Sequence, residues 1–132
     1  MIPVATGDSG TPLPTKLGIK DGHVVAVLNA PKGFLLPVPT TSKLGKGAFD
    51  VIVYFTKSRA DFEVELAKLR NAMTPACGLW IAWPKKASKV ATDMTEDVVR
   101  AVALPTGLVD NKVCAIDETW SGLRLVIRKE LR

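Results

Sequence analysis

The sequence has few of the residues that most often build catalytic or metal centres. It contains one histidine, His23, and two cysteines, Cys77 and Cys114, which are not in a C-x-x-C pair. Because protein zinc sites draw most of their ligands from clusters of these two residue types, this scarcity argues against a bound metal. Two isolated cysteines suit a reducing compartment, where they pack as small hydrophobic side chains. We therefore expect a cytoplasmic protein without a metal site.

Long apolar runs and common catalytic motifs are also missing. No stretch reaches the roughly 18 apolar residues that indicate a membrane helix, and the first residues lack the basic and apolar regions of a signal peptide. The sequence contains neither a G-x-S-x-G elbow nor a phosphate-binding loop of the G-x-x-x-x-G-K-S/T type. From the sequence we therefore assign no catalytic residue, no cofactor and no membrane partner.

What the sequence does contain is the composition of one globular domain. Its 132 residues are 47% hydrophobic and 23% charged. The net charge of +5 favours anionic partners. No basic tract is interleaved with aromatic residues, which argues against nucleic acid as the partner. We expect a single domain over residues 1–132, with the glycine- and proline-rich residues 1–22 as an irregular N-terminal arm containing a short helical turn near 16–19.

The apolar pattern predicts strands that alternate with helices. Short valine-rich and aromatic runs predict five strands, at 23–31, 50–56, 79–83, 112–117 and 123–129. Amphipathic helices follow the second and third strands, with N-caps expected at Ser58 and Asp93. The proline-rich link between the first two strands has no room for a full helix. This order predicts an α/β fold of three layers with a mostly parallel sheet, in which only the last strand runs antiparallel.

Residues 50–129 resemble the second half of a class I methyltransferase-like Rossmann fold. DVIVYFTKS is similar to the fourth strand of that fold, PACGLWIAWPK to its fifth, and VCAIDETWSGLRLVIRK to its terminal hairpin. The resemblance implies a truncated Rossmann-like fold whose five-stranded sheet has the order 1-2-3-5-4 and ends in an antiparallel hairpin.

The chain departs from that fold where the family binds S-adenosylmethionine (SAM). The family uses an acidic-x-Gly-x-Gly turn after its first strand, whereas this chain has NAPKG, from Asn29 to Gly33. Pro31 has no N–H to offer a ligand. The link up to Phe49 is also too short for the strand whose acid would hold the ribose. These departures argue against SAM binding and against methyltransferase activity.

The whole chain also resembles an uncharacterised bacterial family, domain of unknown function 3052. The matching stretches are SGTPLPTKLGIKDGH, WPKKAS, DMTEDVVR and GLVDNKVCAIDETWSGLRLVIRK. The resemblance implies a small bacterial cytoplasmic protein with a Rossmann-like fold, and it brings no activity with it.

Ligands of open α/β sheets bind beyond the carboxyl ends of the parallel strands. The predicted topology places basic, acidic and aromatic side chains there. The candidate ligand-binding residues are Lys32, Lys57, Arg59, Trp83, Lys85, Lys86, Asp117 and Trp120. Lysines supply charge for phosphate, and a tryptophan face can stack a ring. The alternative is that the lysines form a solvated rim and the tryptophans cap the core.

These observations favour a non-catalytic Rossmann-like module that binds an anionic small molecule or a protein partner. The first alternative is a small enzyme that acts on a phosphorylated or carboxylated substrate. The second alternative is a weak nucleic-acid binder. An oligomer could form through an edge strand, either the first or the fourth along the chain.

Overall fold

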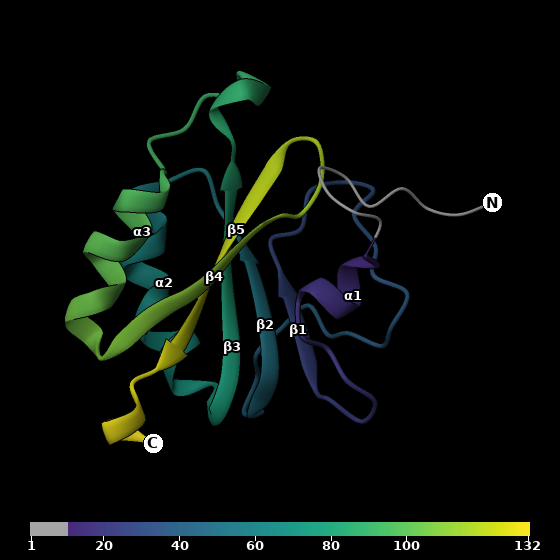
Figure 1. Cartoon of the computed structure of the whole chain (residues 1–132), viewed down its shortest axis with the longest axis vertical. Coiled ribbons are helices and arrows are strands. Elements are labelled where there is room, and N and C mark those ends of the chain that lie inside the picture. The colour runs from purple at the N-terminus through teal and green to yellow at the C-terminus, as the bar shows by residue number, and fades with distance from the viewer. Residues whose placement is uncertain (1–10) are drawn as a thin grey trace.

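A five-stranded sheet lies at the centre of the computed structural model, which describes residues 11–132 (Figure 1). The strands are β1 (Val25–Leu28), β2 (Phe49–Phe55), β3 (Met73–Pro84), β4 (Leu108–Ala115) and β5 (Trp120–Ile127). Their order in the sheet is β1-β2-β3-β5-β4. β1, β2 and β3 are parallel, and β5 is antiparallel to both of its neighbours. The strand order and the single antiparallel strand are those predicted from the sequence.

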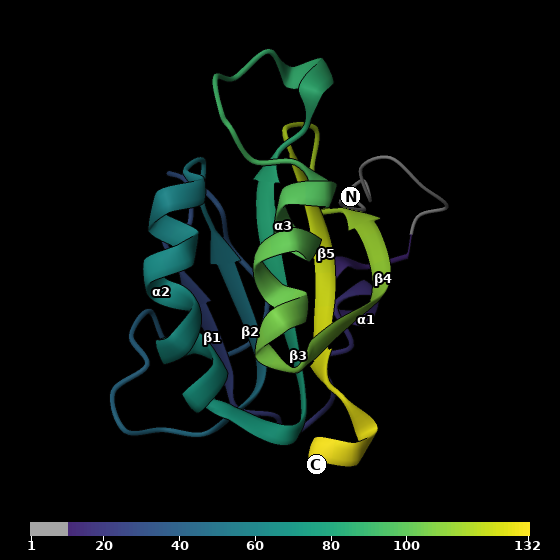
Figure 2. The ribbon, with the colours of Figure 1, turned by 90° about the vertical axis from the view of Figure 1, so that its left-hand side faces the viewer.

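Helices cover both faces of this sheet and complete three layers (Figures 1 and 2). α2 (Arg59–Asn71) and α3 (Glu96–Ala103) lie on one face, and the short α1 (Leu13–Lys16) lies on the other. Three 3-10 turns, η1 (Lys86–Ser88), η2 (Leu104–Thr106) and η3 (Lys129–Leu131), follow β3, α3 and β5. None of the helices within residues 11–132 has the length and apolar character needed to cross a bilayer.

The start of α3 differs from the prediction. Its N-cap is Thr95, whose hydroxyl accepts a hydrogen bond from the N–H of Val98 at 3.1 Å. Asp93, the predicted cap, instead accepts a hydrogen bond from the N–H of Arg59 at 2.7 Å and so satisfies the first turn of α2. The Asp93 prediction was wrong because an Asp-x-x-Glu spacing does not show that a neighbouring helix offers the same side chain a free N–H.

The described part of the N-terminal arm closes the second face of the sheet. The side chain of Leu17 is fully buried there. Its carbonyl accepts a hydrogen bond from the indole N–H of Trp80 on β3 at 3.0 Å. The Lys16 ammonium donates to the carbonyl of Ala115 at the end of β4, at 2.7 Å. The helical turn begins at Leu13, earlier than expected, and residues 1–10 of the predicted arm lie outside the described residues.

The link between β1 and β2 contains no helix, as its prolines and glycines predicted. It instead passes the outer edge of β1, where it runs parallel to the strand at Thr41. There Thr41 donates its N–H to the carbonyl of Val25 at 3.0 Å and accepts from the N–H of Val27 at 2.8 Å. This single bridge holds the link against β1 and fixes where the residues after Thr41 lie.

Candidate functional site

A cavity of about 500 Å³ opens at the carboxyl ends of β1 and β2. This volume is within the range of roughly 300–1,000 Å³ that is usual for small-molecule sites. Its walls come from the ends of both strands, the link that follows β1 and one side of α2. The lining residues are Leu28, Asn29, Ser42, Lys43, Leu44, Tyr54, Asp61, Val64, Glu65 and Lys68. The cavity therefore lies at the predicted edge of the sheet, but at the β1 side of that edge.

Tyr54 places a polar group in this cavity. It stands beside Leu28 in the β1–β2 register and is only 2% exposed. Its hydroxyl is buried and has no hydrogen-bond partner within residues 11–132. Burial raises the pKa of this phenol, the nearby Thr56 hydroxyl opposes the rise, and the carboxylates of Glu65 and Asp61 add to it. Burial therefore favours the neutral form of the phenol, which can both donate and accept a hydrogen bond.

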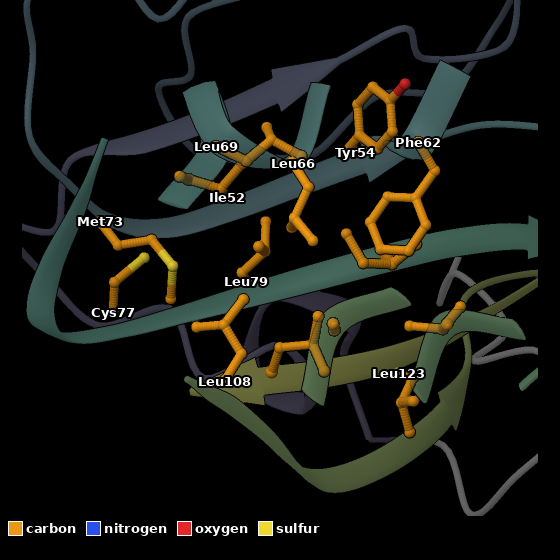
Figure 3. Packing of buried hydrophobic residues seen from close by; sticks show 14 of the residues in the cluster. Ile52, Tyr54, Phe62, Leu66, Leu69, Met73, Cys77, Leu79, Leu108 and Leu123 are labelled. Carbon is orange, nitrogen blue, oxygen red and sulfur yellow. The ribbon is translucent and has the colours of Figure 1, made fainter. Parts of the chain in front are cut away.

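Figure 3 shows the Tyr54 oxygen directed away from the packed side chains of Leu66 and Phe62. A buried hydroxyl without a partner costs about 1–3 kcal/mol. A ligand that hydrogen-bonds to this hydroxyl would recover that cost. Such an unsatisfied group beside a cavity makes the cavity a candidate binding site.

Helix α2 supplies the charged wall. Its side chains Asp61, Glu65 and Lys68 line the cavity. Each stands one position before a buried core residue, and those core residues are Phe62, Leu66 and Leu69. Because successive residues are about 100° apart around a helix, the polar stripe lies next to the buried stripe. Packing of the buried stripe against the sheet therefore sets the direction of the charged one.

The opposite wall comes from the link after β1. The Thr41 hydroxyl donates to the carbonyl of Lys43 at 3.3 Å and accepts from its N–H at 3.4 Å. Leu44 packs against the core cluster beneath α2. The bridge to β1 and this packing hold Lys43 between two anchored residues.

The turn at the end of β1 takes up left-handed backbone geometry. Asn29 has a φ of 57° and Gly33 a φ of 87°. The N–H of Phe34 donates to the carbonyl of Pro31 at 3.0 Å and closes the turn between them. Asparagine tolerates the left-handed region better than most residues, so Asn29 permits a tight reversal without a glycine at that position.

Both tryptophans among the predicted ligand-binding residues are packed in the core. Trp83 is buried in the cluster beneath α2 and α3. Trp120 is buried on the opposite face of the sheet, where its ring packs edge-on against Phe55 with centroids 5.1 Å apart. The two indoles therefore pack on opposite faces of the sheet, and contact with a common ligand stays a prediction.

The structure does bring the loop after β3 to the tip of the β4–β5 hairpin. The N–H of Lys85 donates to the carbonyl of Thr119 at 2.8 Å. The carboxylate of Asp117 accepts hydrogen bonds from the N–H groups of Thr119 and Trp120, both at 2.8 Å. Asp117 thus shapes the hairpin turn, and Lys86 is exposed in η1.

The remaining basic candidates are spread along the same edge. Lys32 and Lys57 are exposed, and the Arg59 guanidinium pairs with Glu63 at 3.1 Å. None of the eight candidates lines the cavity. Their role in ligand binding stays a prediction.

The candidate ligand-binding residues chosen from the sequence did not include any residue that lines the cavity, although two signals pointed to it. Tyr54 is the only tyrosine in the chain and stands within an apolar strand, where a phenol needs a hydrogen-bond partner. Asp61, Glu65 and Lys68 have the helical spacing of four and three. The contribution of Lys43 carried no signal, since it depends on the path of the link.

Comparisons with known proteins identify the fold. No family model and no curated protein sequence matches the chain. Solved structures match at low identity. The ribosomal protein L11 methylase from Lactobacillus delbrueckii subsp. bulgaricus is 8% identical, with a TM-score of 0.53 over 80% of this chain and 70% of that one. The tRNA methyltransferase TrmK of B. subtilis is 14% identical, with a TM-score of 0.53 over 87% of this chain and 64% of that one.

A third structure, LepI in complex with SAM, is 10% identical, with a TM-score of 0.58 over 88% of this chain and 39% of LepI. Across six matched structures the chain spans between 39% and 70% of the other protein's length. At these identities the likeness establishes the methyltransferase-like Rossmann fold that the sequence predicted.

The same comparison corrects the functional expectation. We expected a non-catalytic binding module and took methyltransferase activity to be disfavoured by the NAPKG turn. That expectation was wrong, because the structures that share this fold are described as methyltransferases or contain SAM or S-adenosylhomocysteine (SAH). The NAPKG turn itself takes up left-handed backbone geometry at Asn29 and Gly33.

Proposed function

We propose that this chain is a SAM-dependent methyltransferase domain that binds SAM in the cavity at the carboxyl ends of β1 and β2. The observation that carries the proposal is the buried, unpartnered hydroxyl of Tyr54 in a cavity of about 500 Å³. The cavity lies where open α/β sheets bind ligands. The methyltransferase-like fold supports the choice of ligand.

The residues around the cavity fit such a ligand. The turn after β1 is open, because nothing lies within 4 Å of the place where a Cβ on Gly33 would be. Side chains of positive and of negative charge line the walls, and Tyr54, Asn29 and Ser42 supply uncharged hydrogen-bond donors and acceptors. SAM carries cationic and anionic groups together with ribose hydroxyls, and each of these would find a counterpart.

When bound, SAM supplies an electrophilic methyl group. The chain's own contribution is to hold and orient it. Tyr54 offers the ligand a hydrogen bond, and Leu28, Leu44 and Val64 provide apolar surface that displaces water from the ligand. Lys57, Lys85 and Lys86 lie along the same edge and remain candidates for contact with an anionic partner.

The Tyr54 hydroxyl gives the test of this function. Tyr54→Phe should unfold in urea at the wild-type midpoint or slightly above it, because the hydroxyl has no partner to lose among residues 11–132. Titration calorimetry should nevertheless show SAH binding about 5–10-fold more weakly than to wild type, as expected for one lost hydrogen bond. Wild type that binds neither SAH nor SAM at millimolar concentration would overturn the proposal.

A matched pair of valines tests the location. Val64 is 71% exposed at the cavity, and Val113 is 53% exposed on β4 away from it. Val64→Trp should obstruct the cavity and abolish SAH binding, whereas Val113→Trp should bind like wild type. Equal binding by both variants would place the ligand elsewhere. Methyl transfer itself is checked with radiolabelled SAM against separate pools of RNA, protein and small metabolites.

We also propose that the chain belongs to the family of domain of unknown function 3052 and is a bacterial cytoplasmic protein. The stretches WPKKAS and DMTEDVVR support the family, and the isolated cysteines support the compartment. A family alignment that lacked a residue like Tyr54 at the end of the second strand would argue against a shared function.

A further inference from the structure

We infer that the carboxylates of Asp61 and Glu65 bind the α-ammonium group at the amino-acid end of SAM. The inference rests on the proposed function and assigns the recognition of one end of the ligand to helix α2. Both side chains line the cavity and are one helical turn apart. Within residues 11–132 neither forms an ion pair, whereas the neighbouring Glu63 pairs with Arg59.

Two like charges separated by four residues on a helix repel each other. A cation held between them removes that repulsion. An ammonium group has three N–H donors, and the two carboxylates with the Tyr54 oxygen offer three acceptors on one side of the cavity. Asp61 and Glu65 line the same cavity as Tyr54, whose hydroxyl has no hydrogen-bond partner within residues 11–132. The ammonium is thus the group that best matches this acidic wall.

The rest of the lining distinguishes an amino-acid end from a simple cation. Lys68 stands one turn beyond Glu65 on α2, and Lys43 faces the cavity from the anchored link. These ammonium groups offer charge for an α-carboxylate next to the site of the α-ammonium. A cavity that carries both signs favours a zwitterion over an ion of either charge. The apolar side chains Leu28, Leu44 and Val64 are left for the adenosine part.

The test compares SAH with 5′-methylthioadenosine, which lacks the amino-acid end. Wild type should bind SAH roughly tenfold or more tightly, as expected for charged hydrogen bonds. Glu65→Gln should lose most of that preference by weakening SAH alone. Glu63→Gln, a surface change on the same helix, is the matched control and should retain the wild-type ratio. Calorimetry measures the affinities, and circular dichroism checks that each variant folds.

Three other results would overturn the inference in distinguishable ways. An equal loss of SAH and methylthioadenosine affinity in Glu65→Gln would place the carboxylates on the ribose and leave the proposed function intact. If Glu65→Gln kept the wild-type ratio of SAH affinity to methylthioadenosine affinity, Glu65 of α2 would not bind the amino-acid end of SAM. Wild type that binds neither compound would remove the proposed function itself, and this inference with it.

Discussion

At the scale of single residues, Tyr54 and Cys77 show what burial does to an ionisable group in a site and in a core. Both side chains lie in the cluster beneath α2. Tyr54 reaches the cavity with its hydroxyl, whereas Cys77 is completely buried among apolar neighbours. Burial raises the pKa of the Cys77 thiol from 9.0 to about 12, and the charge of Asp50 adds to the rise. The thiol is therefore a packing group rather than a nucleophile.

This pKa shift predicts how stability depends on pH. The unfolded chain ionises Cys77 near pH 9, while the folded protein keeps the thiol neutral up to about pH 12. The contribution of Cys77 to stability is thus complete below pH 9 and is lost as the pH rises from 9 towards 12. The wild-type free energy of unfolding should fall by up to about 1.4 kcal/mol per pH unit more than that of Cys77→Ala.

Urea unfolding at pH 8, 9 and 10 measures this difference. Tyrosine and lysine residues titrate in the same range, so the comparison with Cys77→Ala isolates the thiol. Parallel pH dependence of the two proteins would show that Cys77 ionises as readily in the folded state as in the unfolded one.

At the scale of elements, the two helices on one face of the sheet are coupled through their first turns. Ser58 caps α2 from within, and its hydroxyl accepts from the N–H of Asp61 at 3.1 Å. Asp93 adds a second acceptor from the loop before α3, and the Thr92 hydroxyl donates to the carbonyl of Lys57 at 2.6 Å. The loops after β2 and β3 are therefore joined, and this fixes the start of the helix that carries Asp61.

The cap of α3 gives a prediction at this scale. Thr95→Ala removes the acceptor for the N–H of Val98 and should lower the free energy of unfolding by about 1 kcal/mol. Thr40→Ala, in the exposed link between β1 and β2, is the control and should stay within about 0.5 kcal/mol of wild type. Urea unfolding measures the change in stability of both variants. In Thr95→Ala, the amides in the first turn of α3 should also exchange hydrogen faster than in wild type. If Thr95→Ala left the free energy of unfolding unchanged, the Thr95 hydroxyl would not stabilise the start of α3.

At the scale of the whole molecule, a polar edge and two apolar faces organise the structure. α2 and α3 cover one face of the sheet, and α1 with the described part of the arm covers the other (Figure 1). The Thr41 bridge occupies part of the outer edge of β1. β4 is the strand at the other end of the sheet. If the protein forms an oligomer through an edge strand, we expect β4 to provide it.

Leu17 tests the role of the arm. Leu17→Ala should lower the free energy of unfolding by about 2–5 kcal/mol, because it leaves a cavity in place of a fully buried side chain on the second face of the sheet. Leu35→Ala is the matched control, since Leu35 is 86% exposed, and should change stability by no more than about 0.5 kcal/mol. Urea denaturation gives both values. A Leu17→Ala protein as stable as the control would show that the arm does not contribute to the core.

The sequence by itself determined the elements and their order. The apolar run around Val53 and the spacing of Phe62, Leu66 and Leu69 specify a buried strand and an amphipathic helix, because local periodicity decides which face of each element is buried. The short link before Trp120 likewise required a hairpin.

Only the tertiary structure decided where the candidate site lies. Lys43 reaches the cavity because Thr41 bridges to β1, and the Tyr54 hydroxyl has no hydrogen-bond partner within residues 11–132. Trp83 and Trp120 entered the two core clusters on opposite faces of the sheet. These outcomes depend on contacts between residues distant in the chain, which the spacing of residues along the sequence does not encode.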